Sequence, residues 1–148
     1  MLLIGAIASC AYEKKSDAPV SPLNGTWKLV SAQSIAQGDT MVTFPVEGQH
    51  MIKIFNSTHF SFFNHDVKKG QDTTQAMFVA GAGRYTLDGE TYHENLEYCS
   101  ARGWEGHDFD FTLTFRQDTL IQRGVEEIDS LGVGREILET YVRMSTTQ

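Results

Sequence analysis

The strongest structural signal in this sequence of 148 residues is the run Asp108-Phe109-Asp110-Phe111-Thr112-Leu113-Thr114-Phe115-Arg116. Large apolar side chains alternate here with polar or charged ones, without an exception. Successive side chains of a β-strand point to opposite faces, so this period of two predicts a strand with one buried face and one solvated face. The buried face should hold Phe109, Phe111, Leu113 and Phe115.

Seven further segments of strand-like composition lie between turn residues. With the run above they predict eight strands, which span residues 26–36, 49–55, 58–64, 76–87, 90–98, 108–116, 119–126 and 135–144. No window has a sustained apolar period of 3.6 residues, so helices should be few. Tight turns such as Asp88-Gly89 join several of the strands. The fold class predicted is therefore all-β, an eight-stranded antiparallel up-and-down barrel, because closure leaves no open sheet edge.

Two short sequences, at the start and in the middle of the predicted barrel, resemble a known family. Gly25-Thr26-Trp27-Lys28-Leu29-Val30, together with Arg143 in the last predicted strand, is similar to the lipocalin superfamily, and in particular to lipocalin-like domains of bacterial envelope proteins. The segment from Gly83 to Asn95 resembles the middle hairpin of the same group. The Thr-Asp-Tyr of core lipocalins is replaced by Arg116-Gln117-Asp118-Thr119, which favours the wider superfamily.

The resemblance implies roles for several residues of the barrel. Trp27 would close one end, with the Arg143 guanidinium across its face, so Trp27 would be structural. Residues 37–48 would fold over the open mouth as a lid that presents Met41, Val42, Phe44 and Val46. Independently of the resemblance, Gly81 and Gly83 inside one predicted strand indicate a bend or bulge where the barrel curves.

The N-terminal segment resembles a bacterial lipoprotein signal. Leu2 to Ala8 is apolar but too short to span a bilayer, and Ile7-Ala8-Ser9-Cys10 is similar to a lipobox, which implies lipidation of Cys10. No Lys or Arg precedes this segment, so the natural signal is expected to begin upstream. The implied organisation is a partial signal over 1–10, a tether over 11–23 and a barrel over 24–148, located in the bacterial cell envelope. The alternative is a buried N-terminal strand with a free cysteine.

The composition and motifs narrow the classes of partner. A net charge of -7 repels nucleic acid and anionic lipid headgroups, so membrane contact is expected through the lipid anchor only. No phosphate-binding loop, nucleophile elbow or metal-ligand spacing is present in the sequence. We therefore expect no enzymatic activity, no cofactor and no metal.

The clearest candidate for ligand contact is Glu94. The period of two places Glu94 on the apolar face of its strand with Tyr92, Leu96 and Tyr98, and counting from the Asp88-Gly89 turn sets Tyr85 opposite Tyr92. A carboxylate inside a barrel is unfavourable unless it is paired, hydrated or used by a ligand, so Glu94→Gln should not lower stability. The candidate ligand-binding residues are Tyr85, Tyr92, Glu94, Tyr98 and Phe111. The alternatives are an internal hydrogen bond of Glu94 or a bulge that turns it to solvent.

Three functions fit these observations. The first is non-catalytic binding of a small hydrophobic or amphipathic molecule inside the barrel. The second is a protein-interaction or inhibitor module that uses the open-end loops, where Trp104 lies between two glycines. Trp104 could contact a ligand or partner, or fold back as a plug. The third is an enzyme with Glu94 and Tyr92 as an acid–base pair. A filled barrel interior would exclude the first function.

Overall fold

The computed structural model describes residues 20–145 of the chain, so the predictions for Cys10 and most of the tether lie outside the described residues. The elements follow in the order β1 (Gly25–Ala36), β2 (Asp39–Phe44), β3 (Gln49–Phe55), β4 (His59–Asp66), β5 (Phe78–Asp88), β6 (Thr91–Cys99), η1 (Arg102–Trp104), β7 (His107–Arg116), β8 (Thr119–Ile128), η2 (Asp129–Leu131) and β9 (Val133–Arg143). No helix within residues 20–145 is long and apolar enough to cross a membrane.

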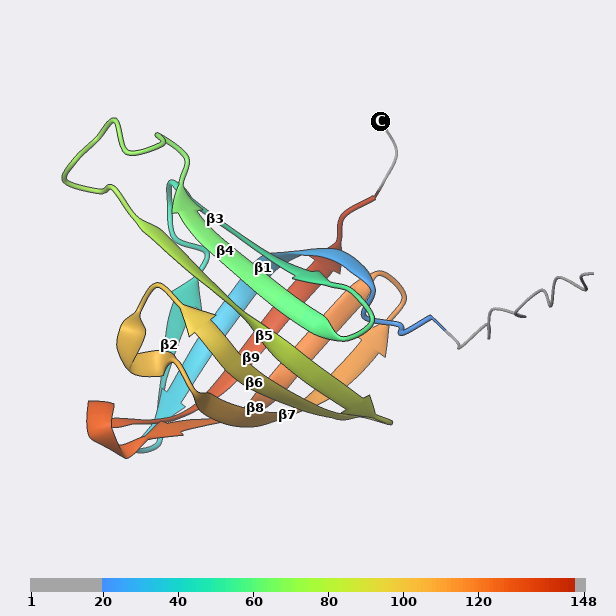
Figure 1. Ribbon diagram of the computed structural model, residues 1–148. Coiled ribbons are helices and arrows are strands. Elements are labelled where there is room, and N and C mark those ends of the chain that lie inside the picture. Colours follow the sequence, from blue (N-terminus) through green and yellow to red (C-terminus); the bar gives the residue numbers. More distant parts are fainter. Residues whose placement is uncertain (1–19, 146–148) are drawn as a thin grey trace, which may run out of the picture.

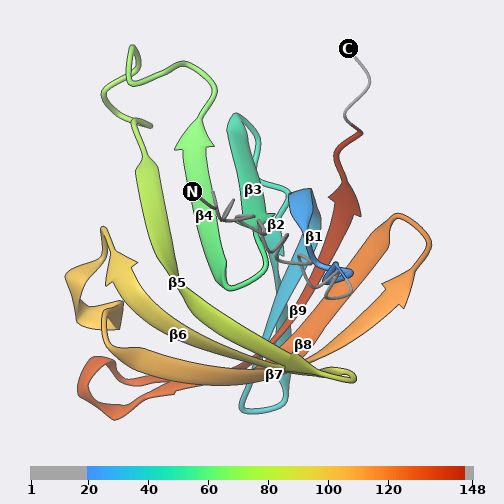
Figure 2. The same ribbon diagram turned by 45° about the vertical axis from the view of Figure 1, so that its right-hand side comes forward.

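The strands form a closed antiparallel barrel (Figure 1, Figure 2). From β3 to β9 each strand pairs with the next, and β1 pairs with β3 on one side and with β9 on the other. Eight strands, β1 and β3 to β9, therefore close the barrel, and each predicted range matches its strand to within two residues at either end. The predictions of an eight-stranded barrel and of few helices are both confirmed for the described residues.

The prediction of a lid over residues 37–48 is wrong. This segment contains β2, which pairs with β1 between Ala32 and Ala36, and Met41 and Val42 are exposed to solvent. The physical reason is the two-residue turn Gln37-Gly38, in which both residues have positive φ, 53° and 88°. That is the pattern of a tight type I′ hairpin, which returns the chain directly along the free edge of β1.

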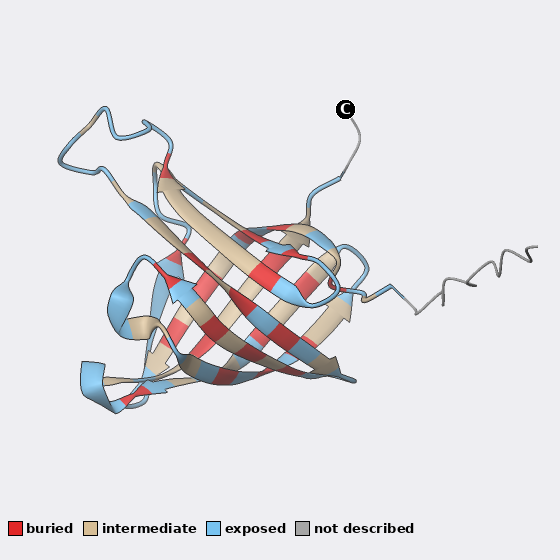
Figure 3. Cartoon of the chain, viewed as in Figure 1, coloured by how far each residue is buried: buried red, intermediate tan, exposed pale blue. Residues whose placement is uncertain are grey.

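The closed end of the barrel is built around Trp27. Its side chain is fully buried, its indole N–H donates to the Leu23 carbonyl at 2.7 Å, and the Arg143 guanidinium carbon lies 4.1 Å from the ring centre. This arrangement confirms the roles that the resemblance implied for Trp27 and Arg143. Buried positions alternate along the strands that run away from this end (Figure 3), and the fully buried side chains among them include Tyr92, Tyr141, Phe60, Leu113 and Leu120.

A β-bulge in β6 changes which residues face the interior. Ala82 pairs with Tyr98 but Arg84 pairs with Asn95, so two residues of β6 lie opposite Gly83 alone. A Cβ atom on Gly83 would lie 1.8 Å from the Asn95 carbonyl oxygen, so only glycine fits there. Beyond the bulge the inside–outside phase inverts, which turns Tyr98 outward and Cys99 inward. The bulge predicted from the glycines is confirmed.

Candidate functional site

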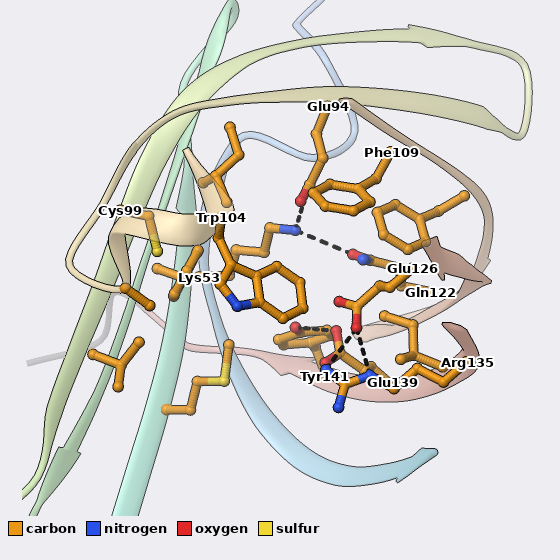
Figure 4. Close-up of a pocket in the computed structure, with 17 residues that line it drawn as sticks. Lys53, Glu94, Cys99, Trp104, Phe109, Gln122, Glu126, Arg135, Glu139 and Tyr141 are labelled. Atoms are coloured by element: carbon orange, nitrogen blue, oxygen red, sulfur yellow. Dashed lines mark hydrogen bonds and ion pairs between the residues drawn. The ribbon is translucent and has the colours of Figure 1, made fainter. Parts of the chain in front are cut away.

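The barrel interior contains a cavity of about 320 Å³ toward the end that carries η1 (Figure 4). Its walls come from all strands except β1 and β2, together with η1 and the residue before it. The apolar part of the wall consists of Met51, Phe62, Val79, Leu96, Cys99, Ala101, Trp104, Phe109, Phe111 and Ile137. Pockets for small molecules typically begin at roughly 300 Å³, so the space suits a compact ligand.

An aromatic group covers one side of the cavity. Trp104 folds back from η1 onto Phe109, with ring centres 6.0 Å apart, and Phe109 stacks on Phe111 at 6.2 Å. The Arg135 guanidinium carbon lies 5.7 Å from the Trp104 ring centre. Trp104 is half-buried, so its side chain is folded back onto the barrel, which was one of the two alternatives predicted for it. Its ring forms part of the cavity wall near the mouth.

A buried ion pair forms the floor of the cavity. The Lys53 ammonium donates to Glu94 Oε2 at 2.7 Å and to Gln122 Oε1 at 3.2 Å, and the Tyr92 hydroxyl donates to the same Glu94 oxygen at 2.9 Å. Lys53 is 3% exposed and Glu94 7%. Burial, reinforced by the Glu94 charge, raises the pKa of Tyr92 well above its usual value, so Tyr92 remains a neutral donor. Good geometry and several hydrogen bonds offset the desolvation of the two charges.

Lys53 is the first of several residues of the site that the sequence analysis did not identify; the others include Glu126, Arg135 and Glu139. The Lys53 ammonium also lies 4.9 Å from the ring centre of Phe60 and 5.2 Å from that of Tyr92, distances at which a cation is attracted to an aromatic face. The signal was present in the sequence, because Met51, Lys53 and Phe55 alternate with outward residues along β3. The period of two applied to this strand places Lys53 inside the barrel.

A second polar group lies on the wall formed by β8 and β9. The Arg135 guanidinium binds Glu126 Oε2 at 2.7 Å, and the Tyr141 hydroxyl donates to Glu139 Oε2 at 2.6 Å. Burial raises the pKa of Glu126, and the charge of Arg135 opposes this effect. Burial also raises the pKa of Glu139, which only the Tyr141 hydrogen bond and the more distant Lys53 charge counteract. Of the two, Glu139 is the carboxylate without an ion pair among the described residues.

The structure places two of the five predicted ligand-binding residues in the wall of the cavity, and a third in contact with one of them. Glu94 and Phe111 line it, and Tyr92 lies fully buried beneath Glu94. Tyr98 does not belong to this group, because the bulge in β6 turns its side chain outward, where it is 65% exposed. The interior placement predicted for Tyr98 is therefore wrong.

Tyr85 is buried, as predicted, but does not reach the cavity. Its hydroxyl donates to the Asn56 carbonyl at 2.7 Å, toward the closed end of the barrel. The predicted register was also wrong: Tyr85 pairs with Glu94, and Leu87 pairs with Tyr92, because the hairpin loop is Gly89-Glu90 with Gly89 at φ 61°. A shift of two residues preserves the inside–outside phase, which explains why Tyr85 still points inward.

His93 lies on the opposite face of β6 from Glu94. Its Nδ1 atom is 2.8 Å from an Asp110 carboxylate oxygen on the outer surface of the barrel. Within residues 20–145 no group of three histidine, cysteine or acidic side chains could hold a metal ion. These polar residues therefore form surface pairs separate from the cavity.

Comparison with solved structures identifies similar folds. A lipocalin-like protein from Bacteroides uniformis ATCC 8492 aligns with a TM-score of 0.50 and 17% sequence identity, over 82% of this chain and 98% of that chain. An uncharacterized protein from Bacteroides eggerthii DSM 20697 aligns with a TM-score of 0.48 and 14% identity, over 82% and 99% of the two chains. No protein-family model and no curated protein matches the sequence. The first likeness shows that this chain has a lipocalin-like fold.

Proposed function

We propose that the barrel binds a small, largely apolar molecule non-covalently and catalyses no reaction on it. The observation that supports this function is the cavity of about 320 Å³ beside Glu94, with aromatic and aliphatic walls and a few convergent polar groups. Ligand pockets have this composition in general, and a lipocalin-like barrel suits ligand binding.

The other two functions have less support. A barrel used only through its loops has no need of an open interior, so the cavity favours ligand binding over a protein-interaction or inhibitor module. An acid–base pair needs groups that exchange protons near neutral pH. Glu94 is in an ion pair with Lys53, and burial raises the pKa of Tyr92 well above its usual value. Tyr92 is therefore unsuited to proton transfer near neutral pH, and the Glu94 oxygen that it contacts is also bound by Lys53.

Native mass spectrometry of the protein purified from its own host tests the proposal. Val79→Phe should fill part of the cavity, because Val79 lines it, whereas Val125→Phe adds the same ring at an outward position that is 54% exposed. We expect a co-purifying mass on the parent protein and on the Val125 variant, and its loss from the Val79 variant. A parent protein without any bound mass, or a Val79 variant that keeps it, would contradict ligand binding in this cavity.

We also propose that the protein is a lipoprotein of the bacterial cell envelope, anchored to the membrane through Cys10 alone. The proposal rests on Ile7-Ala8-Ser9-Cys10 and on the polar segment Glu13 to Asp17 that follows. Intact-mass analysis of the product of the full native gene should find diacylglycerol on Cys10 and no residues before it. A water-soluble product that retains residues 1–9 would refute the anchor.

A further inference from the structure

The positive and negative charges of the side chains around the cavity do not cancel. Five of them line it, and four form two ion pairs of 2.7 Å each, Lys53 with Glu94 and Arg135 with Glu126. The fifth is Glu139, whose carboxylate accepts a hydrogen bond from the Tyr141 hydroxyl but has no cation within ion-pair distance among residues 20–145. With every group ionised, the cavity holds one more negative than positive charge.

The surroundings of Glu139 do not compensate for that charge. Besides Tyr141 on its own strand, the charged groups that act on it are Lys53 from β3, Glu94 from β6 and Glu126 from β8. Lys53 is already bound to Glu94, and the Glu94 and Glu126 carboxylates repel the negative charge of Glu139. A half-buried carboxylate in this position is unfavourable unless it binds a proton or a cation.

We propose that the ligand has a protonated amine, which forms an ion pair with Glu139 while its apolar body packs against Trp104, Phe109 and Phe111. This inference rests on the proposed function of the cavity. An ammonium group supplies the missing positive charge without breaking either existing pair, and the neighbouring aromatic rings favour a cation and its methylene groups. A ligand with a carboxylate end, such as a fatty acid, would instead add to the excess negative charge.

Isothermal titration calorimetry with three matched probes tests the amine. The probes are 4-phenylbutylamine, 4-phenylbutanol and 4-phenylbutyrate, which share an apolar body and differ in the charge of the polar end. We expect the amine to bind at least about ten-fold more tightly than the alcohol, the low end of the coupling measured for close charge pairs, and the carboxylate to bind most weakly. Equal affinities, or a preference for the carboxylate, would overturn the inference.

Two variants locate the effect. Glu139→Gln keeps the shape of the side chain and should reduce the affinity for the amine to that for the alcohol. Glu127→Gln removes an exposed carboxylate from the neighbouring strand β8 and should leave all three affinities unchanged. An amine preference that survives Glu139→Gln would assign it to another group and overturn the inference.

Proton release gives a readout independent of the variants. Burial raises the pKa of Glu139 in the free protein, and an ammonium group beside it would lower that pKa again. Binding of the amine at mildly acidic pH should therefore release protons, seen as a binding enthalpy that depends on the ionisation enthalpy of the buffer. Proton uptake would contradict the ion pair. If the alcohol binds, Val79→Phe abolishes that binding and the amine binds no more tightly than the alcohol, then the proposed amine is refuted but ligand binding in the cavity is supported. If none of the three probes binds, the result counts against both the amine and the proposed function.

Discussion

An arginine of β9 lies over a tryptophan at each end of the barrel, but the two pairs differ in what holds them. At the closed end the Arg143 guanidinium donates to the Asn24 and Pro22 carbonyl oxygens, each at 2.7 Å, and lies 4.1 Å from the ring centre of Trp27. Main-chain carbonyls cannot move away without unfolding the segment that carries them. The closed end is therefore a fixed element of the fold.

At the open end, the corresponding contacts are made between side chains. Arg135 lies 5.7 Å from the ring centre of Trp104 and binds the Glu126 carboxylate, and Trp104 is half-buried beside the cavity. Such partners can change rotamer when a ligand enters, at a smaller cost than moving the backbone. The two pairs are alike in composition, but one is fixed in the fold and the other lines the cavity proposed to bind a ligand.

Truncating each tryptophan in turn should produce the largest difference between the two ends. Trp27→Ala should lower the free energy of unfolding by about 3–5 kcal/mol, because it leaves a cavity in a fully buried core and removes the surface that Arg143 covers. Trp104→Ala should cost less than half as much, since its ring is half-buried, but should weaken binding of any cavity ligand. Urea denaturation and calorimetry measure the two effects. Equal losses of stability would mean that Trp104 is also part of the fixed core.

Glu94→Gln should have the next largest effect, at the floor of the cavity. Removing one partner of a buried ion pair leaves the other charge without compensation. The unpaired Lys53 ammonium should therefore lower the free energy of unfolding of this variant by about 3 kcal/mol. The double variant Lys53→Met with Glu94→Gln should recover much of that loss, because no buried charge remains. Denaturation of both variants in urea measures the coupling. If Glu94→Gln alone were as stable as the parent protein, the unpaired Lys53 ammonium would not destabilise the barrel interior.

The ion pair between Lys53 and Glu94 could not be predicted from the sequence. Without a partner for Glu94, the sequence predicts that Glu94→Gln does not lower stability, because it removes an uncompensated buried charge. The alternation rule places both Lys53 and Glu94 inside the barrel, but it does not bring β3 and β6 together: these strands are separated by β4 and β5, and the pair spans the barrel interior. Side chains that meet across an interior depend on barrel closure and strand tilt, which local sequence patterns do not contain.

The fold was more predictable than the site because its determinants are local. Phe109, Phe111 and Leu113 fix the inward face of β7 by period two alone, and the resemblance placed Trp27 and Arg143 correctly. Tyr98 was misplaced because one bulged residue inverts the phase of a strand, and Gly83, the signal for that bulge, lies on the neighbouring strand. A glycine that indicates a bulge does not say which of two paired strands contains the extra residue.

The smallest expected effect concerns the pH dependence of stability at Glu139. Burial raises its folded pKa above the ordinary value of 4.5, so between that value and the raised pKa the folded protein binds more protons than the unfolded chain. Its contribution to stability therefore falls as pH rises through this window. Glu139→Gln removes the contribution, so the variant should gain about 1 kcal/mol or less at neutral pH, and no gain should remain below pH 4.5.

Glu136, on the outer side of the same strand, provides a control of opposite sign. The hydrogen bond and charge of Arg123 lower the pKa of Glu136, so its contribution to stability is present at neutral pH and is lost as pH falls through the lowered pKa. Glu136→Gln should therefore cost stability at neutral pH and become neutral in acid, and the loss should be small because the pair is solvated. Urea denaturation across this pH range compares the two variants. If Glu139→Gln followed the same trend as Glu136→Gln, Glu139 would have a stabilising partner in the barrel, and an amine would have no unpaired carboxylate to bind.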